Sequence, residues 1–578
     1  TVANLKNTTC RIRISDARTA FTSEVSDVSD TLFTVLPQIN VTQPVSSQNV
    51  TAYSNTTPIR WTYTGSTVNN VNTYYSTDAG SNWTLINSSI PVTNNGTYIW
   101  PSVPIVTSST AMVKVQDADL SLVNGTSPIF NIVGNLRLTA PDGSENWEVG
   151  TTKTITWSQY AVNLVNLSYS LNNGTNWTSL VTNYNATPPN YQWNIANDTQ
   201  ASNLAKVKVD DASNPFVVND TSNNPFSIIP VFDLTQPENG NIVVAEETYN
   251  INWTSKGTGV SNVTLEYSTD NGGNWSYVRN VSDYTVSNTG TYYWNPIPGD
   301  KLSEQAKVRV SYPQNTNASN LSSGAFYLRG KLTVASPDGA EAWNLSALEN
   351  ITWTKKGNIG AVNIYYSPDN GANWTTLATS VNASLFTWAW NITETTTTTT
   401  QGRIKVADSS LVDFVYDTSN STFAVRGKIN VTAPSASGIV STYNGGTSSY
   451  NITWTRFGPI AKVNITYSTD GGSTYPDTIA ANLSAGSSPY NWTIPDKIGY
   501  NLSIKISDYD NPSVNDTSDN LFAIKGSMFV NQPNGAESWL KGTTQAIRWT
   551  PAGTYPGNAK LYYSNNSGTN WTYIGEAS

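Results

Sequence analysis

The chain has 578 residues, which is too long for a single hydrophobic core and indicates several domains. Charged residues make up only 12% of it, the net charge is −9, and no run of Lys or Arg exceeds two residues, so the basic surface of a nucleic-acid-binding protein is missing. Histidine is absent and there is one cysteine, which excludes His-based catalysis, His-ligated metals, disulfides within the chain and thiolate clusters. No stretch of 18 apolar residues predicts a membrane span.

The first segment, residues 1–36, matches only the back half of a repeat that recurs along the chain. The sequence Ile-Arg-Ile-Ser-Asp at 12–16 aligns with Ile-Lys-Ile-Ser-Asp at 504–508. Both segments show the alternation of apolar and polar residues that is typical of a half-buried strand. We therefore expect a partial repeat here.

The repeat is marked by a Trp that is preceded two residues earlier by Ile, a pair that occurs six times. The pairs are Ile59 and Trp61, Ile155 and Trp157, Ile251 and Trp253, Ile351 and Trp353, Ile452 and Trp454, and Ile547 and Trp549. Successive tryptophans of this set lie 95 to 101 residues apart. A second aromatic residue follows a turn, at Trp83, Trp177, Trp275, Trp374, Tyr475 and Trp571, and a third follows at Trp100, Trp193, Trp294, Trp390 and Trp492. We expect three aromatic residues in the core of each complete unit.

Within a unit the apolar residues recur with a period of two. In the second repeat, Ile155 and Trp157 share one face of a strand, and Val165 and Leu167 share one face of the next. Clusters of Gly, Asn, Pro and Asp separate the strands, and no helical pattern competes. About seven short strands in roughly 96 residues are typical of a two-sheet sandwich. We predict an all-β chain, a tandem array of Ig-like (fibronectin-III-like) β-sandwich domains.

The predicted boundaries divide the chain into five complete and two partial repeats. They are residues 1–36 (the C-terminal half of a repeat), 37–134, 135–230, 231–330, 331–427, 428–526 and 527–578 (the N-terminal half of a repeat). Two to four residues separate the last strand of one unit from the first strand of the next, and no Pro-rich or Gly/Ser-rich linker intervenes. Joints this short predict a stiff rod.

The two partial repeats allow two interpretations. Residues 1–36 and 527–578 together lack only about ten residues of one repeat. Under the first interpretation, the sequence is an excerpt of a longer array. Under the second, the C-terminal half of one chain is completed by the N-terminal half of the next. Both predict a filament-like object, and we expect self-association in a head-to-tail or helical filament.

A polar turn follows the third strand of several repeats. It reads Ser-Thr-Asp-Ala-Gly-Ser-Asn-Trp at 76–83, and related sequences stand at 268–275 and 367–374. The pattern S-x-D-x-G-x-x-W resembles the Asp-box hairpins of sialidases. In such a turn the Asp accepts hydrogen bonds from amides, and the Gly takes the left-handed conformation. One turn per repeat is too few for a propeller, and we interpret it as a structural turn.

Acidic residues gather at the two ends of a later hairpin. The candidates for a calcium site are Asp210, Asp211, Asp220, Asp508 and Asp516. Carboxylates that met there would offer the hard oxygens that calcium takes. The third repeat has Ser311 and Tyr312 at the corresponding positions, so we favour a role in turns, predict no cofactor, and keep calcium as the alternative.

The sequence contains about 35 N-x-S/T sequons. In the strands, the sequon Asn falls on the face opposite the core residues, as Asn252 does between Ile251 and Trp253. The alternative is that any polar residue there must face outward. We predict N-linked glycans, and the candidate sites are Asn40, Asn82, Asn166, Asn176, Asn252, Asn262, Asn274, Asn350, Asn373, Asn430, Asn451, Asn464, Asn491 and Asn570.

Several motifs of the second repeat occur together in one known family. Pro-Asp-Gly at 141–143, Trp147, Ile-Thr-Trp-Ser at 155–158 and Tyr-Gln-Trp-Asn-Ile at 191–195 resemble the Ig-like domain of Ser/Thr-rich GPI-anchored fungal wall proteins, and similar domains repeated in large bacterial and archaeal surface proteins. The likeness covers the chain repeat by repeat, although the first and third repeats have Val in place of Trp147. The resemblance implies a surface or extracellular location and a structural or adhesive role, and no catalytic residue carries over.

The monotony of the repeats favours a structural protein over an enzyme, because a catalytic site would be concentrated in one or two units. We predict a structural extracellular glycoprotein, a segment or subunit of a cell-surface filament, stalk or surface layer. The main alternative is an adhesin or carbohydrate-binding array in which aromatic residues such as Tyr74, Tyr365 and Tyr562 stack on cell-surface glycans. A third is the domain array of a secreted hydrolase without its catalytic part. We expect no nucleic-acid partner.

Overall fold

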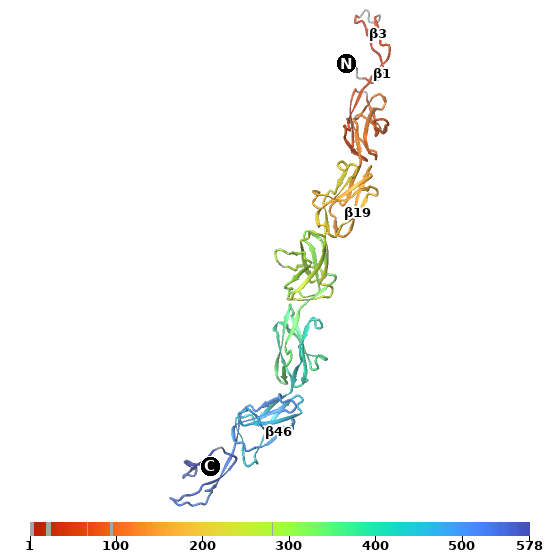
Figure 1. Ribbon diagram of the computed structural model, residues 1–578. Helices are drawn as coiled ribbons and strands as arrows, with labels where there is room; N and C mark the ends of the chain where they lie inside the picture. The colour runs from red at the N-terminus through yellow and green to blue at the C-terminus, as the bar shows by residue number, and fades with distance from the viewer. Residues whose placement is uncertain (1–4, 19–24, 66–67, 93–95, 280, 556) are drawn as a thin grey trace. The chain divides into compact units, whose positions relative to one another are not determined.

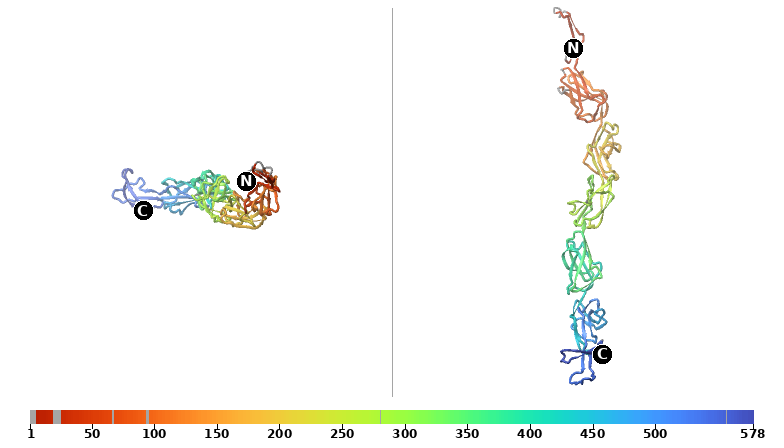
Figure 2. Two further views of the ribbon diagram at one scale, coloured as in Figure 1. Left: turned by 90° about the horizontal axis from the view of Figure 1, so that it is seen from above. Right: turned by 90° about the vertical axis from the view of Figure 1, so that its left-hand side faces the viewer.

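The computed structural model describes residues 5–18, 25–65, 68–92, 96–279, 281–555 and 557–578. Within these ranges the chain forms strands, turns and one 3₁₀ turn, η1 (Ala383–Leu385), and no α-helix. Figure 1 shows the strands gathered into successive sandwiches, and Figure 2 shows the same sandwiches from two further sides. None of the described residues forms a helix long and apolar enough to cross a membrane.

The chain divides into two compact units. One comprises residues 1–241, 250–294 and 305–326, and the other comprises 242–249, 295–304 and 327–578. The first unit contains the first two sandwiches, the second unit contains the fourth and fifth, and the strands of the third sandwich are shared between them.

The second sandwich illustrates the common plan. Its smaller sheet has the strand order β14-β16-β19, and its larger sheet has the order β15-β22-β20-β17-β18, with β21 paired to β20. The strands are β14 (Asn135–Ala140), β15 (Asn146–Glu148), β16 (Thr152–Tyr160), β17 (Leu164–Ser170), β18 (Thr178–Asn185), β19 (Asn190–Asn194), β20 (Ser202–Asp211), β21 (Asn219–Thr221) and β22 (Phe226–Ile229). Strands β15 and β22 are parallel, and the other pairs are antiparallel.

The core of the second sandwich lies between its two sheets. Ile155 and Trp157 of β16, and Val165 and Leu167 of β17, are buried and alternate with more exposed residues. Trp147 packs against Phe226, with ring centroids 4.8 Å apart. A slip of one residue would turn the whole apolar set of a strand to solvent, so the alternation fixes the register of each pairing.

The first sandwich has the same arrangement, with the sheets β10-β7-β5 and β6-β13-β11-β8-β9, and β12 paired to β11. Its strands are β5 (Gln38–Gln43), β6 (Asn49–Thr51), β7 (Pro58–Thr64), β8 (Asn70–Ser76), β9 (Thr84–Pro91), β10 (Thr97–Ile99), β11 (Ser108–Asp117), β12 (Asn124–Thr126) and β13 (Phe130–Val133). Val50 is buried at the position of Trp147, where it pairs with Ile132.

The third sandwich has a smaller sheet of the order β23-β25-β29. In the larger sheet β26 pairs with β27, β28 and β30, and β30 pairs with β31, while β24 runs parallel to β32. The strands are β23 (Val231–Gln236), β24 (Ile242–Val244), β25 (Tyr249–Lys256), β26 (Asn262–Ser268), β27 (Ser276–Tyr277), β28 (Thr285–Ser287), β29 (Thr291–Trp294), β30 (Ser303–Tyr312), β31 (Asn315–Leu321) and β32 (Phe326–Arg329).

The fourth and fifth sandwiches repeat the plan of the second. The fourth has the sheets β33-β35-β38 and β34-β41-β39-β36-β37, and the fifth has β42-β44-β47 and β43-β50-β48-β45-β46. The strands of the fourth are β33 (Lys331–Ser336), β34 (Ala342–Asn344), β35 (Leu348–Lys356), β36 (Ala361–Ser367), β37 (Thr375–Asn382), β38 (Thr387–Asn391), β39 (Thr399–Asp408), β40 (Tyr416–Thr418) and β41 (Phe423–Arg426). Those of the fifth are β42 (Lys428–Ala433), β43 (Gly438–Thr442), β44 (Ser449–Phe457), β45 (Lys462–Ser468), β46 (Asp477–Ser484), β47 (Tyr490–Thr493), β48 (Gly499–Asp508), β49 (Asn515–Thr517) and β50 (Phe522–Lys525).

The segments 5–36 and 527–578 form pairs of strands. At the N-terminal side β1 (Asn7–Cys10) pairs with β4 (Phe33–Val35), and β2 (Arg13–Ser15) pairs with β3 (Ser26–Val28). At the C-terminal side β51 (Ser527–Gln532) pairs with β52 (Arg548–Ala552), and β53 (Ala559–Tyr563) pairs with β54 (Thr572–Ala577).

The predicted all-β array of Ig-like sandwiches is confirmed, but the aromatic residue that follows the turn does not belong to the core as expected. The tryptophans of the first and third sets are buried in the complete sandwiches, such as Trp157 and Trp193 in the second. The aromatic residue after the turn, such as Trp177, is only half-buried, because it lies on the outer face of the larger sheet. Other aromatic residues complete each core, such as Phe130 in the first sandwich and Trp147 and Phe226 in the second.

Candidate functional site

The acidic candidates of the second sandwich are divided between the two faces of one sheet. In the register of β20 and β21, Asp220 stands opposite the buried Val209, while Asp210 is opposite Asn219. Asp210 accepts a hydrogen bond from Asn166 Nδ2 at 2.9 Å. Because neighbouring residues of a strand point to opposite faces, the carboxylates of Asp210 and Asp220 point away from each other.

Asp220 and its equivalents bridge the two sheets of a sandwich. Asp220 Oδ2 accepts a hydrogen bond from the backbone N–H of Leu138, on the first strand of the smaller sheet, at 2.7 Å. Asp417 does the same for Val334 at 2.8 Å, Asp516 for Val431 at 2.7 Å, and the amide oxygen of Asn320 for Leu234 at 2.9 Å. Since an uncharged amide serves in the third sandwich, the position requires an acceptor and not a negative charge.

Asp211 and Asp508 each cap the start of a loop. Asp211 Oδ1 accepts from the backbone N–H of Ser213 at 2.9 Å, and Asp508 Oδ1 accepts from that of Asp510 at 3.0 Å. Nowhere in the described ranges do three or more acidic, His or Cys side chains converge as metal ligands would. The five calcium candidates therefore make hydrogen bonds within the protein, and the structure does not bring them together into one site.

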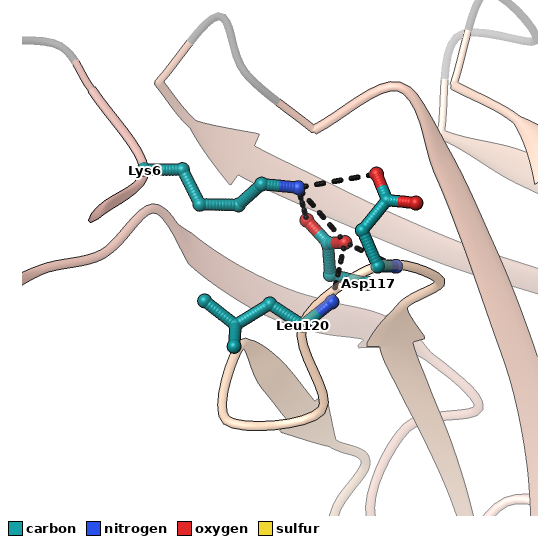
Figure 3. A network of polar contacts seen from close by, with 4 residues as sticks. Lys6, Asp117 and Leu120 are labelled. Carbon is teal, nitrogen blue, oxygen red and sulfur yellow. Dashed lines mark hydrogen bonds and ion pairs between the residues drawn. The ribbon is translucent and has the colours of Figure 1, made fainter. Parts of the chain in front are cut away.

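In the first sandwich, Asp117 is the equivalent of Asp211, and a lysine binds it (Figure 3). Lys6 Nζ lies 3.0 Å from Asp117 Oδ2 and 3.3 Å from Asp119 Oδ2. Asp117 Oδ1 also accepts from the backbone N–H of Leu120 at 3.2 Å. Burial lowers the pKa of Lys6, but its hydrogen bonds and charge interactions with the two carboxylates outweigh that effect and raise the pKa. The ammonium group of Lys6 thus neutralises these carboxylates.

The Asp-box turns are closed by their own side chains. Ser76 Oγ donates to Asp78 Oδ1 at 2.7 Å, and Asn82 donates through its backbone N–H at 2.9 Å and through Nδ2 at 2.6 Å. These hydrogen bonds, that of Ser76 first, lower the pKa of Asp78 to about 2. Gly80 has a φ of +86°, which glycine adopts without strain. This network agrees with a structural turn.

Of the aromatic residues considered for sugar binding, Tyr74 and Tyr365 are half-buried, and lysines cover part of each ring. Lys114 Nζ lies 4.7 Å from the ring centroids of both Tyr74 and Trp83. Lys405 Nζ lies 5.5 Å from the ring of Tyr365. These cation–π contacts occupy ring faces that a sugar would need. Tyr562, in the segment 527–578, is 47% exposed.

Most of the candidate glycosylation sites are exposed to solvent. Eleven of the fourteen are exposed: Asn40, Asn82, Asn176, Asn262, Asn274, Asn350, Asn373, Asn430, Asn451, Asn491 and Asn570. The other three are half-buried: Asn166, Asn252 and Asn464. The exposed set lies on outward strand positions, loops and turns, where a glycan would not displace core side chains.

Two of the half-buried sequon residues have a structural role that the sequence analysis missed. Asn166 Oδ1 accepts from the backbone N–H of Asn183, and Asn464 Oδ1 accepts from that of Asn482, both at 3.0 Å. Asn183 and Asn482 each have a positive φ and lie where the register of the neighbouring strand shifts. The accepting side chain stabilises the backbone at that irregularity. Asn72 and Asn363 make the same bond to Ser89 and Ser380 at 2.9 Å, and neither is in a sequon. The recurrence of Asn at this position of the strand, with or without a sequon, is the feature of the sequence that indicates the structural role.

The chain is similar to known proteins at the level of solved structures alone. No protein-family model matches the chain, and no curated protein matches it. Among solved structures, the N-terminal eight Ig domains of Down Syndrome Cell Adhesion Molecule (isoform 1.30.30) match at 12% identity over 87% of this chain and 62% of that chain, with a TM-score of 0.20. The chain thus spans less than two thirds of that structure.

Two further solved structures are similar at the same level. Sidekick-1 immunoglobulin domains 1–5 match at 10% identity over 85% of this chain and 98% of that chain, with a TM-score of 0.16. The fibronectin(III)-like modules of CbhA from Clostridium thermocellum match at 20% identity over 34% of this chain and 94% of that chain, with a TM-score of 0.14. The assignment of the fold therefore rests on the strand order of this chain, and the resemblance to GPI-anchored wall proteins stays a prediction.

Proposed function

We propose that this chain is part of an extracellular structural glycoprotein, a sandwich array of a cell-surface filament, stalk or surface layer. The observation that carries the proposal is the repeated placement of sequon asparagines at exposed positions of successive sandwiches. Asn40 of β5 and Asn430 of β42 occupy equivalent outward positions, as do Asn350 of β35 and Asn451 of β44. A glycan coat there would shield sheets from pairing with those of other molecules. It would also supply solubility that the low content of charged residues does not.

Contacts at the joints support a structural role. In the first unit, Gly257 donates its N–H to Asn197 O at 2.7 Å, and Ala201 donates to Thr258 O at 2.9 Å, so that adjacent sandwiches are linked by backbone hydrogen bonds. In the second unit, Thr554 donates its N–H and hydroxyl to the two carboxylate oxygens of Asp496 at 2.7 and 2.6 Å. Bonds of this kind restrain bending and suit an array that transmits force.

The proposal also includes self-association of the chain into a filament. Residues 527–578 expose Trp539 and Leu540, and Val530 and Trp571 line a hollow of about 930 Å³. In the fifth sandwich, β48 pairs with β45, the equivalent of β53, and β50 pairs with β48. We expect a second copy of the chain to cover this face, because an exposed apolar face promotes association.

Electron microscopy of the native material, together with mass spectrometry of its glycopeptides, tests the proposal. We expect extended filaments or a surface layer, and glycans on exposed sites such as Asn40 and Asn430. Native protein that is unglycosylated and isolated as single particles in solution would contradict it. Short, isolated rods that bind to the surface of another cell would favour the adhesin instead.

A further inference from the structure

We propose that the third sandwich carries a carbohydrate-binding groove on the outer face of its larger sheet. This inference goes beyond the structural role and does not depend on it. The groove encloses about 580 Å³, and its lining includes Thr264, Glu266, Arg309, Ser311, Tyr277 and Tyr284. All of these residues belong to the first compact unit. The volume is in the range of small-ligand sites, roughly 300–1,000 Å³.

The groove exists because the third sandwich departs from the common plan at one position. The other four complete sandwiches have an Asn there whose side chain holds the neighbouring strand: Asn72, Asn166, Asn363 and Asn464. In those sandwiches the neighbouring strand is eight residues long, as β9, β18, β37 and β46 show. The third sandwich has Thr264 instead, and its strand β27 ends after two residues.

The floor of the groove is polar and is fixed by the register of the sheet. Thr264 of β26 stands opposite Ser311 of β30, and Glu266 stands opposite Arg309. Arg309 Nε and Nη2 donate to Glu266 Oε2 at 2.9 and 2.7 Å, and the guanidinium also lies 4.4 Å from the ring centroid of Trp275. This pairing holds both side chains in place and neutralises their charges.

Several polar atoms of the floor are left available for a ligand. The hydroxyls of Thr264 and Ser311 have no hydrogen-bond partner in the part of the chain that the structure describes, although Ser311 is only 4% exposed. Oxygen Oε1 of Glu266 likewise has no partner among the described residues, because both bonds from Arg309 go to Oε2. These two hydroxyls and this carboxylate oxygen can therefore exchange hydrogen bonds with a ligand.

The wall of the groove is aromatic. The rings of Tyr277 and Tyr284 are stacked, with centroids 4.0 Å apart and an angle of 15° between the planes. Each tyrosine is 42% exposed. Asp283 accepts from the N–H and the hydroxyl of Thr285 at 2.9 and 2.7 Å, and these bonds fix the end of the loop that brings Tyr284 over Tyr277.

The chemistry of the groove fits a neutral pyranose. An aromatic face packs against the C–H face of a sugar ring, while hydroxyls and a carboxylate oxygen exchange hydrogen bonds with sugar hydroxyls. An anionic ligand is disfavoured because Glu266 already neutralises Arg309 and because Asp283 lines the rim. A purely apolar ligand would leave the floor unsatisfied. None of the other four complete sandwiches combines these residues, so the array would have one site.

Titration calorimetry on the whole chain, produced without glycosylation, tests the proposal. The probes are the soluble hexamers of β-1,4-linked glucose, β-1,4-linked N-acetylglucosamine and α-1,6-linked mannose. We expect at least one of them to bind with one site per chain. Tyr284→Ala should weaken its affinity about tenfold, because it removes the outer ring of the wall. Tyr284→Phe keeps the ring and should retain affinity within about threefold.

Tyr293→Ala provides the matched control. Tyr293 is 59% exposed and belongs to β29, in the other sheet of the same sandwich, so its loss should leave the affinity unchanged. No binding by any of the three hexamers would overturn the proposal. Binding that Tyr284→Ala leaves unchanged, or that Tyr293→Ala weakens equally, would also overturn it. Tyr284→Phe preserves the stacked pair of rings. If this variant binds the hexamer while Tyr284→Ala does not, the loss of affinity comes from the loss of the ring and not from unfolding.

Discussion

Oxygen Oδ2 of Asp516 accepts a hydrogen bond from the backbone N–H of Val431 at 2.7 Å, and this bond links β49 in one sheet of the fifth sandwich to β42 in the other. Val431 is buried and lies where the register of β42 and β44 shifts. Strand β42 is at the edge of its sheet, and a backbone N–H on the outer side of an edge strand has no partner within the sheet, so the side chain supplies one.

Replacing Asp516 should therefore destabilise the fifth sandwich. We expect Asp516→Ala to cost about 1–3 kcal/mol, because it leaves the N–H of Val431 buried without a partner. Asp516→Asn should retain most of the stability, since Asn320 fills the same role in the third sandwich. Hydrogen exchange at the amides of the fifth sandwich, measured in the whole chain at increasing urea concentrations, reports the change in its free energy of unfolding. If Asn is as damaging as Ala, the negative charge and not the acceptor is what matters.

The same contacts predict that calcium does not stabilise the sandwiches. Asp210 and Asp220 point to opposite faces of their sheet, and both accept hydrogen bonds within the protein. We expect the thermal unfolding midpoint of the chain to be the same with millimolar calcium and with a chelator. A midpoint that rises with calcium and is lowered by Asp220→Asn would contradict this reading of the hairpin.

The sequence was sufficient for the fold because the apolar residues alternate so regularly. Ile155 and Trp157 define one strand by themselves, and the spacing of the Ile–Trp pairs defines the array. The groove of the third sandwich was not predictable in the same way. It depends on Thr264 standing where Asn is the rule, and the effect of that change is seen only when the neighbouring strand β27 stops and Tyr284 folds onto Tyr277. Nor does spacing alone distinguish an exposed sequon Asn from one that supports a strand.

The Asp-box turns should lose stability in acid. The pKa values of Asp78, Asp270 and Asp369 are lowered from 3.8 to about 2, by hydrogen bonds led respectively by Ser76 Oγ, Asn274 N–H and Asn373 Nδ2. A carboxyl group whose pKa is lower in the folded state stabilises the fold above its unfolded pKa, and this contribution is lost as the pH falls through the folded pKa. The turns should therefore weaken between about pH 4 and pH 2.

The second sandwich supplies an internal control for that titration. Its turn has Asn172 in place of the Asp, and Asn172 Oδ1 accepts from Asn176 N–H at 2.9 Å as the carboxylates do. An amide does not titrate in this range, so the amide signal of Gly174 should stay constant between pH 4 and pH 2 while that of Gly80 shifts. Equal shifts of both glycines in NMR spectra would show that the change comes from elsewhere.

Glycan occupancy should follow exposure and not the sequon alone. We expect glycans on exposed residues such as Asn40, Asn350 and Asn430, and none on Asn166 or Asn464, whose amide groups are half-buried and hydrogen-bonded to the neighbouring strand. Mass spectrometry of glycopeptides from the native protein measures the occupancy of each site. A glycan on Asn464 in folded protein would contradict the expectation.

Substitution separates the two roles of asparagine in the fifth sandwich. Asn464→Ala removes the acceptor that holds the N–H of Asn482, which lies in a left-handed conformation with a φ of +53°, and should cost about 1 kcal/mol or more. Asn430→Ala, at an exposed position of β42, should change the stability by less than about 0.5 kcal/mol in unglycosylated protein. Urea unfolding followed by hydrogen exchange in β46 compares the two variants. Equal effects would mean that the hydrogen bond from Asn482 contributes nothing to stability. The packing of Leu483 against the core would then be what stabilises the irregularity in β46.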